Sequence, residues 1–127
     1  MYHVVATEKS LYEATVDLRA AILRLGFAIL HVQELGAPGN GWAAECDEDC
    51  TVFTVDSPRC SEPLLAHDMR CALVLPWRIA VYTEAGSTRI GLLRPLPLLA
   101  GLSADAVVAE AARELEERLR QIVDEAR

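Results

Sequence analysis

Apolar residues recur every three or four positions in two long stretches of the chain, which is the spacing of one face of an α-helix. The first stretch covers residues 11–25. Ser10 and Glu13 at its start have the spacing of a capping box, in which each side chain bonds the other residue's backbone amide. Gly26 follows it, as is typical of a helix end. The second stretch covers residues 104–126, with Ser103 as the expected N-cap. We therefore predict two long helices with these bounds.

Shorter apolar runs between the two helices predict β-strands. They cover residues 2–6, 27–32, 51–55 and 71–75. Residues 61–67 are expected to form one or two helical turns, because a proline is tolerated early in a helix.

The stretch from residue 73 to residue 95 predicts a β-hairpin. Ala85 and Gly86 form its two-residue loop. This register places Val81 opposite Ile90, and it places Trp77 opposite Arg94 on the same face, since side chains alternate along a strand.

The resulting order of elements is β-α-β-β-β-β-β-α, with the short helical turn between the third and fourth strands. Hairpins in the second half favour a mainly antiparallel sheet, with both long helices on one face. We therefore predict an α+β fold. The length of 127 residues is that of a single domain, residues 1–127.

The net charge of the chain argues against some classes of binding partner. The chain carries 19 acidic and 12 basic residues, a formal net charge of −7. Because an acidic surface repels phosphate backbones and anionic lipid, we expect neither nucleic acid nor a membrane as partner. No apolar run approaches the ~20 residues that span a bilayer. The first residues lack the features of a signal peptide, so a cytoplasmic location with reduced cysteines is expected.

Four cysteines and a histidine raise the alternative of a thiol or metal site. Cys46 and Cys50 are separated by three residues, not by the two of a zinc knuckle, and Cys60 and Cys71 add no second short pair. His67 lies two helical turns after Cys60, and no nucleophile or phosphate-binding motif is present. We expect no metal, no cofactor and no catalytic residue. A thiol- or metal-dependent enzyme or sensor using Cys46, Cys50, Cys60 and His67 remains the alternative.

Several short motifs follow one another along the chain. In order they are Gly26-Phe27-Ala28-Ile29-Leu30, Asp56-Ser57-Pro58, Leu75-Pro76, Val81-Tyr82, Gly86, Ile90-Gly91 and Arg94-Pro95. In this order they resemble domain-of-unknown-function family 302, over nearly the whole chain apart from residues 36–50. The resemblance implies a TBP-like fold, with a curved antiparallel sheet and two helices across its convex side. It also implies a homodimer, and it implies no established activity.

The sequence departs from the family pattern at two positions. Members commonly carry Cys-Asn-Pro after the central strand and Leu-Pro-Cys before the hairpin, where this chain has Asp56-Ser57-Pro58 and Leu75-Pro76-Trp77. A pocket lined by these positions would present the carboxylate of Asp56 and the indole of Trp77.

Five residues are candidates for a ligand pocket at the rim of the sheet: His31, Asp56, Trp77, Arg78 and Arg94. His31 is either a structural residue or a ligand contact. Asp56 either caps a turn or accepts a hydrogen bond at the pocket mouth. Trp77 and Arg94 form either a surface cation–π pair or the wall and anchor of an anion site. Arg78 points away from Trp77 by strand alternation, which favours a dimer contact.

We interpret the chain as a non-enzymatic, dimeric binding or interaction module. Its expected partners are a second copy of itself and a small, anionic ligand.

Overall fold

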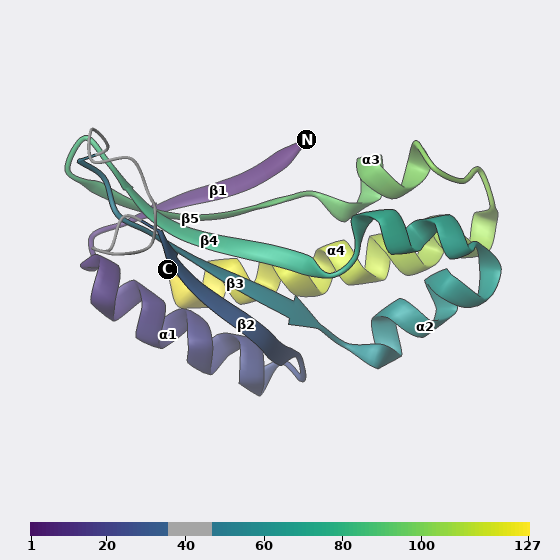
Figure 1. Ribbon diagram of the computed structural model, residues 1–127, viewed down its shortest axis with the longest axis horizontal. Helices are drawn as coiled ribbons and strands as arrows, with labels where there is room; N and C mark the ends of the chain where they lie inside the picture. The colour runs from purple at the N-terminus through teal and green to yellow at the C-terminus, as the bar shows by residue number, and fades with distance from the viewer. Residues whose placement is uncertain (36–46) are drawn as a thin grey trace.

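The computed structural model describes residues 1–35 and 47–127, which form a mixed α+β fold (Figure 1). The strands are β1 (Tyr2–Thr7), β2 (Ala28–Leu35), β3 (Cys50–Asp56), β4 (Trp77–Glu84) and β5 (Ser87–Leu93). The helices are α1 (Leu11–Arg24), α2 (Pro58–His67), α3 (Pro95–Ala100) and α4 (Ala106–Ala126). A 3₁₀ helix, η1 (Met69–Val74), precedes β4.

The five strands form one antiparallel sheet in the order β1-β5-β4-β3-β2. β4 and β5 form the predicted hairpin, in which Val81 lies opposite Ile90. The loop residues Ala85 and Gly86 have φ angles of 51° and 84°. Positive φ at both central residues is the geometry of a type I′ turn, which matches the twist of the strands. The predicted hairpin loop and the Val81–Ile90 pairing are confirmed.

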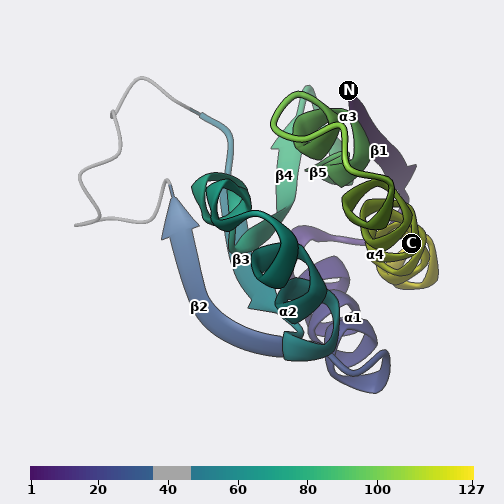
Figure 2. The same cartoon turned by 90° about the vertical axis from the view of Figure 1, so that its right-hand side faces the viewer.

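Helices α1 and α4 cover one face of the sheet, as Figures 1 and 2 show together. α1 begins with the predicted capping box, since the Ser10 hydroxyl accepts from the Glu13 amide at 3.1 Å and the Glu13 carboxylate accepts from the Ser10 amide at 3.3 Å. Gly26 follows α1 with a φ of 85°. α4 packs against α1, α2 and α3. The predicted α+β fold class is confirmed.

The core lies between the sheet and these helices. Alternate residues of the central strands point into it, and α1 and α4 contribute one apolar face each. Its largest fully buried side chains include Leu18, Ile22, Phe53, Ile79, Ile90, Leu115 and Leu119. One face of the sheet is therefore buried in the core.

Residues 71–75 do not form the strand that their apolar run predicts. Most of them belong to η1, which Asp68 caps by accepting from the backbone amide of Arg70. Cys71 is fully buried while Leu73 is 77% exposed, so the run packs only one side against the core. A short apolar run fits a buried strand and a buried helical turn equally well. The sheet consequently has five strands and not six.

The start of α4 also differs from the prediction, and α3 is an additional helix. α4 begins at residue 106 because Asp105, and not Ser103, is the N-cap: its carboxylate accepts from the amides of Val107 and Val108 at 2.7 and 3.4 Å. The Ser103 hydroxyl instead accepts from the Asp105 amide. α3 was not predicted at all. It begins at Pro95, whose fixed φ suits the first position of a helix.

Gly91 lets the edge strand β1 approach β5 closely. Val4 lies opposite Gly91 in the ladder. A Cβ atom at Gly91 would lie 2.5 Å from Val4 Cγ2 and 3.1 Å from the carbonyl oxygen of His3. A side chain at position 91 must therefore displace Val4 and the strand that carries it.

Gly91→Ala is expected to lower the free energy of unfolding by about 1–3 kcal/mol, the usual cost of overpacking, in urea denaturation. Gly101→Ala is the matched control. A Cβ atom there would meet nothing closer than 3.5 Å, and its φ of −70° is ordinary for alanine. The control is expected to lose no stability. An unchanged Gly91→Ala variant would contradict the close approach of the two strands.

Candidate functional site

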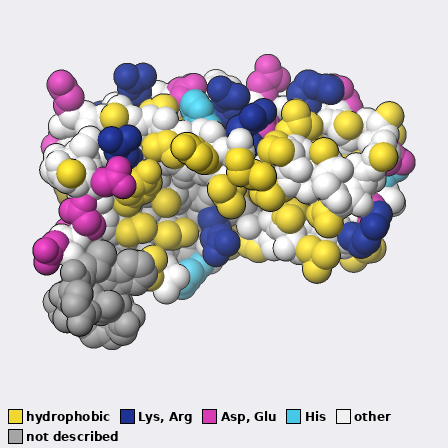
Figure 3. All heavy atoms as spheres, turned by 90° about the horizontal axis from the view of Figure 1, so that it is seen from above, with side chains coloured by type: hydrophobic (Ala, Val, Ile, Leu, Met, Phe, Trp, Pro, Cys, Tyr) yellow, Lys and Arg dark blue, Asp and Glu magenta, His cyan; other side chains and the backbone are white. Residues whose placement is uncertain are grey.

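The face of the sheet opposite α1 and α4, which we call the open face, carries a row of small and apolar residues. The strand register aligns Val52, Ala80, Gly91 and Val4 across β3, β4, β5 and β1. The surface of the sheet is lowest at the centre of this row, because Ala80 has only a methyl group and Gly91 has no side chain. Figure 3 looks onto this face, and hydrophobic side chains gather over its middle.

A groove of about 860 Å³ lies over this row. β1, β3, β4 and β5 supply its floor, and η1, the segment after η1 and α3 supply the rest of its lining. Its further apolar lining includes Tyr2, Leu73, Val74, Leu75, Pro76, Leu93 and Leu98. Tyr2, Leu73 and Leu93 are each more than half exposed. Contiguous exposed apolar surface is typical of binding sites, and the volume is in the range of small-molecule pockets, which makes the groove a candidate site.

Arg78 is the one charged residue among the described residues that line the groove. It lies on the open face of β4 and is exposed. Within the described part of the chain its guanidinium makes no ion pair, since the nine ion pairs found there involve other residues. Arg89, on the same face of β5, lies 3.5 Å from the Glu84 carboxylate. A positive charge that no described acidic side chain pairs with therefore borders an apolar groove.

His31 and Thr54 continue the row of Arg78 across the sheet. The ladder pairs His31 with Thr54 and Thr54 with Arg78. A register shift between Ile29 and His31 gives β2 this alignment with β3. The structure thus brings two of the five predicted site residues, His31 and Arg78, to the same face.

Trp77 borders the groove with a small part of its surface, whereas Asp56 does not line it. Trp77 is only 5% exposed and belongs to the core, and its indole Nε1 has no hydrogen-bond partner among the described residues. Asp56 ends β3, where one carboxylate oxygen accepts from the Ser61 hydroxyl at 3.3 Å. Its other oxygen, Oδ1, is buried without a partner in the same part of the chain. The Asp56 side chain therefore joins the end of β3 to α2.

Arg94 is held by an acidic residue of α4. Its Nε and Nη2 atoms donate to the carboxylate of Glu116 at 3.3 and 3.1 Å. Glu116 is buried and also accepts from the backbone amide of Leu96 in α3 at 3.2 Å. The cation–π contact found among the described residues joins Arg19 to Phe53, not Arg94 to Trp77. Arg94 therefore fastens α3 to α4.

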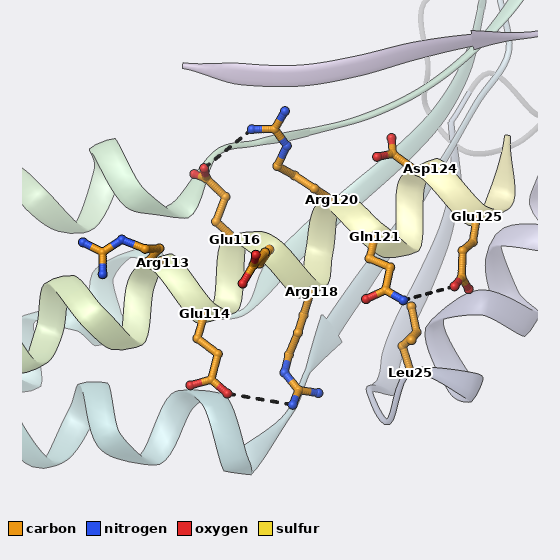
Figure 4. A pocket seen from close by; sticks show the side chains of 10 residues that line it. Leu25, Arg113, Glu114, Glu116, Arg118, Arg120, Gln121, Asp124 and Glu125 are labelled. Atoms are coloured by element: carbon orange, nitrogen blue, oxygen red, sulfur yellow. Dashed lines mark hydrogen bonds and ion pairs between the residues drawn. The ribbon is translucent and has the colours of Figure 1, made fainter.

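A second hollow, of about 880 Å³, follows the charged face of α4 (Figure 4). Most of its charged side chains are paired with one another or with neighbours, Glu117 being without a partner among the described residues. Arg118 lies 3.8 Å from Glu114, and Gln121 donates to Glu125, which also binds Arg24. Because most of these charged groups already have a partner and would have to give it up for a ligand, the open-face groove is the stronger candidate site.

The comparison with known proteins places the chain in a family. The family model described as domain of unknown function DUF302 matches residues 2–126. The chain belongs to the DUF302 family. Among solved structures it is similar to an uncharacterized conserved protein DUF302 from Bacillus stearothermophilus, with a TM-score of 0.86 and 22% identity over 99% of this chain and 98% of that chain. That similarity shows a shared fold. No curated protein matches the chain.

The cysteines of this DUF302 chain do not gather at one point in the described residues. Cys60 and Cys71 are free thiols, and no three His, Cys, Asp or Glu side chains there form a metal-binding group. Burial raises the pKa of the Cys71 thiol, which keeps it protonated and unreactive. Cys46, which the thiol or metal alternative includes, lies outside the described residues.

No helix within residues 1–35 and 47–127 has both the length and the apolar character needed to cross a bilayer.

The sequence analysis missed most of the groove lining of this DUF302 domain. Thr54 and Ala80 carry no charge or reactive group, so no motif marks them. The alternation of residues along β3 and β4 places them on the face opposite Phe53 and Ile79, and that pattern was available in the sequence. Leu98 offers no such indication, because α3 itself was not predicted.

Asp68 holds η1, which forms one wall of the groove. Its carboxylate accepts from the Arg70 guanidinium at 2.6 Å and from the Arg70 backbone amide at 2.9 Å. These hydrogen bonds lower the pKa of Asp68 from 3.8 to about 2. A carboxyl group with a lowered pKa in the folded state stabilises the fold above its unfolded pKa, and this contribution disappears as the pH falls through the folded value.

Unfolding stability is therefore expected to decrease between about pH 4 and pH 2 more steeply in the wild type than in Asp68→Asn, which has no proton to take up at this position. Arg70→Gln removes the guanidinium donors but keeps the backbone amide donor, so it is expected to reduce the slope only in part. Thermal melts at half-unit pH steps measure it. Identical slopes in all three proteins would show that the Asp68–Arg70 pair does not stabilise the fold.

Proposed function

We propose that this DUF302 domain is a non-enzymatic binding module whose open-face groove holds a small molecule with an anionic group at Arg78. The observation that carries the proposal is the guanidinium of Arg78, which has no ion-pair partner in residues 1–35 and 47–127 and lies beside an apolar groove. The apolar lining favours a ligand that can be removed from water, and Arg78 favours one that carries negative charge.

Arg78 is a better anchor than Arg94. The Arg94 guanidinium already faces the buried Glu116 carboxylate, so an anion there would have to compete with a built ion pair. Arg78 is exposed and has no acidic neighbour within hydrogen-bonding distance among the described residues. On a chain of net charge −7, a local positive charge next to apolar surface selects where an anion can bind.

The fluorescent probe 8-anilinonaphthalene-1-sulfonate, which has an apolar body and one sulfonate, tests this proposal. The folded protein at pH 7 is expected to bind it saturably. Arg78→Gln is expected to weaken binding about tenfold or more, because a hydrogen bond to a charged group contributes about 1.5–3 kcal/mol. Arg59→Gln is the matched control: Arg59 is exposed on α2 and does not line the groove.

Two results of this titration would contradict the proposal. One is the absence of saturable binding to the folded protein. The other is an Arg78→Gln variant that binds the probe as tightly as Arg59→Gln does, since the positive charge would then have no part in recognition.

The same proposal includes self-association, which the family resemblance implies. The edge strand β2 supports it, because a sheet edge offers backbone groups for pairing and Leu30 on this strand is 58% exposed. Light scattering at micromolar concentration is expected to give twice the chain mass of 13.9 kDa. A mass of a single chain at all concentrations would contradict the dimer. The cytoplasmic location expected from the sequence stays a prediction.

A further inference from the structure

The open-face groove differs chemically between its two ends. On β3 and β4 the lining includes the hydroxyl of Thr54 and the guanidinium of Arg78, which lie in one row of the sheet. On β1, β5 and α3 the lining is Tyr2, Val4, Gly91, Leu92, Leu93 and Leu98, none of which carries a charge. A ligand that lies along the groove therefore meets a polar end and an apolar end.

We infer that the ligand is an amphiphile with one apolar chain and a monoanionic carboxylate head, an inference that rests on the proposed function. The head lies at Arg78, and the chain extends across β5 past Leu93 toward Leu98, with the low floor at Ala80 and Gly91 beside it. The polarity of the groove fixes this direction.

The charge at the site selects a monoanion. One guanidinium can bind one carboxylate through two parallel hydrogen bonds. Arg78 is the one charged lining residue among those described, so a doubly charged phosphate would keep an uncompensated charge on a protein of net charge −7. The Thr54 hydroxyl, next to Arg78 in the row, supplies a further donor.

The size of the groove selects a ligand with a chain. A water molecule takes up about 30 Å³ in the liquid, so a groove of about 860 Å³ holds on the order of 30 water-sized groups. A compact carboxylate would leave most of it filled with water against apolar walls. A chain beside the low floor at Ala80 and Gly91 displaces that water.

A second copy of the protein fits this surface less well than a small amphiphile does. A two-fold dimer brings the same patch of both copies together. Two grooves that face each other enclose a void and do not fill it. The two Arg78 side chains would also lie near the two-fold axis, where their like charges repel.

Isothermal titration with hexanoate, octanoate and decanoate, each below its micelle concentration, tests the inference. Burial of one methylene contributes about 0.8 kcal/mol, so the dissociation constant is expected to fall about fourfold per added methylene until the groove is filled. Arg78→Gln is expected to weaken all three carboxylates by a similar factor, because it removes only the head contact.

Leu73→Ser tests the chain contact. Leu73 lies on the groove wall and is 77% exposed, whereas Leu23, on α1 outside the groove, is 56% exposed. Because both side chains are exposed, both serine variants are expected to fold, which circular dichroism checks. Leu73→Ser is expected to weaken decanoate at least threefold and hexanoate less, and Leu23→Ser is expected to change neither.

The outcomes separate the two levels of the proposal. Equal affinity for all three carboxylates, with continued dependence on Arg78, overturns the amphiphile and leaves the anion site standing. Failure of every carboxylate to bind, together with probe binding that ignores Arg78→Gln, overturns both. Dissociation of a dimer by Leu73→Ser but not by Leu23→Ser, without carboxylate binding, shows that a second copy covers the groove and overturns the inference.

Discussion

The packing of α1 and α4 on the same face of the sheet is the constraint on which the rest of the structure depends. The sheet gives one face to the core, where Phe53, Ile79 and Ile90 meet the two helices. In the described part of the chain, the lining of the opposite face comes only from the sheet itself, η1 and α3 and the residues beside them. An apolar sheet face left uncovered in this way is costly in water unless something binds it. The groove and its single cation follow from this arrangement.

Local sequence patterns predicted the parts of the fold that local interactions decide. The capping box at Ser10, the helical spacing behind it and the two-residue hairpin loop each contain their own physical cause, and each was confirmed. The predictions failed where two structures satisfy the same pattern. The apolar run at residues 71–75 suits a strand or a 3₁₀ turn, and only the packing of Cys71 with the core decides between them.

The candidate site was predictable only in part, for a similar reason. Alternation placed Arg78 on the face opposite Trp77, which the structure agrees with. The sequence could not show that Arg94 is neutralised by Glu116, because these residues are 22 positions apart and meet only when α3 packs on α4. Because Glu116 pairs with Arg94, Arg78 and not Arg94 is the candidate residue for binding an anion.

The central claim is that the open face, and not the charged face of α4, is the recognition surface. A nuclear magnetic resonance titration of the isotopically labelled protein with decanoate tests it most directly, because each backbone amide reports its own surroundings. The account predicts that the largest shift changes occur at Val52, Ala80 and Gly91, with α4 unaffected. Changes concentrated at Glu114 and Arg118 of α4, with none on β3 to β5, would contradict it.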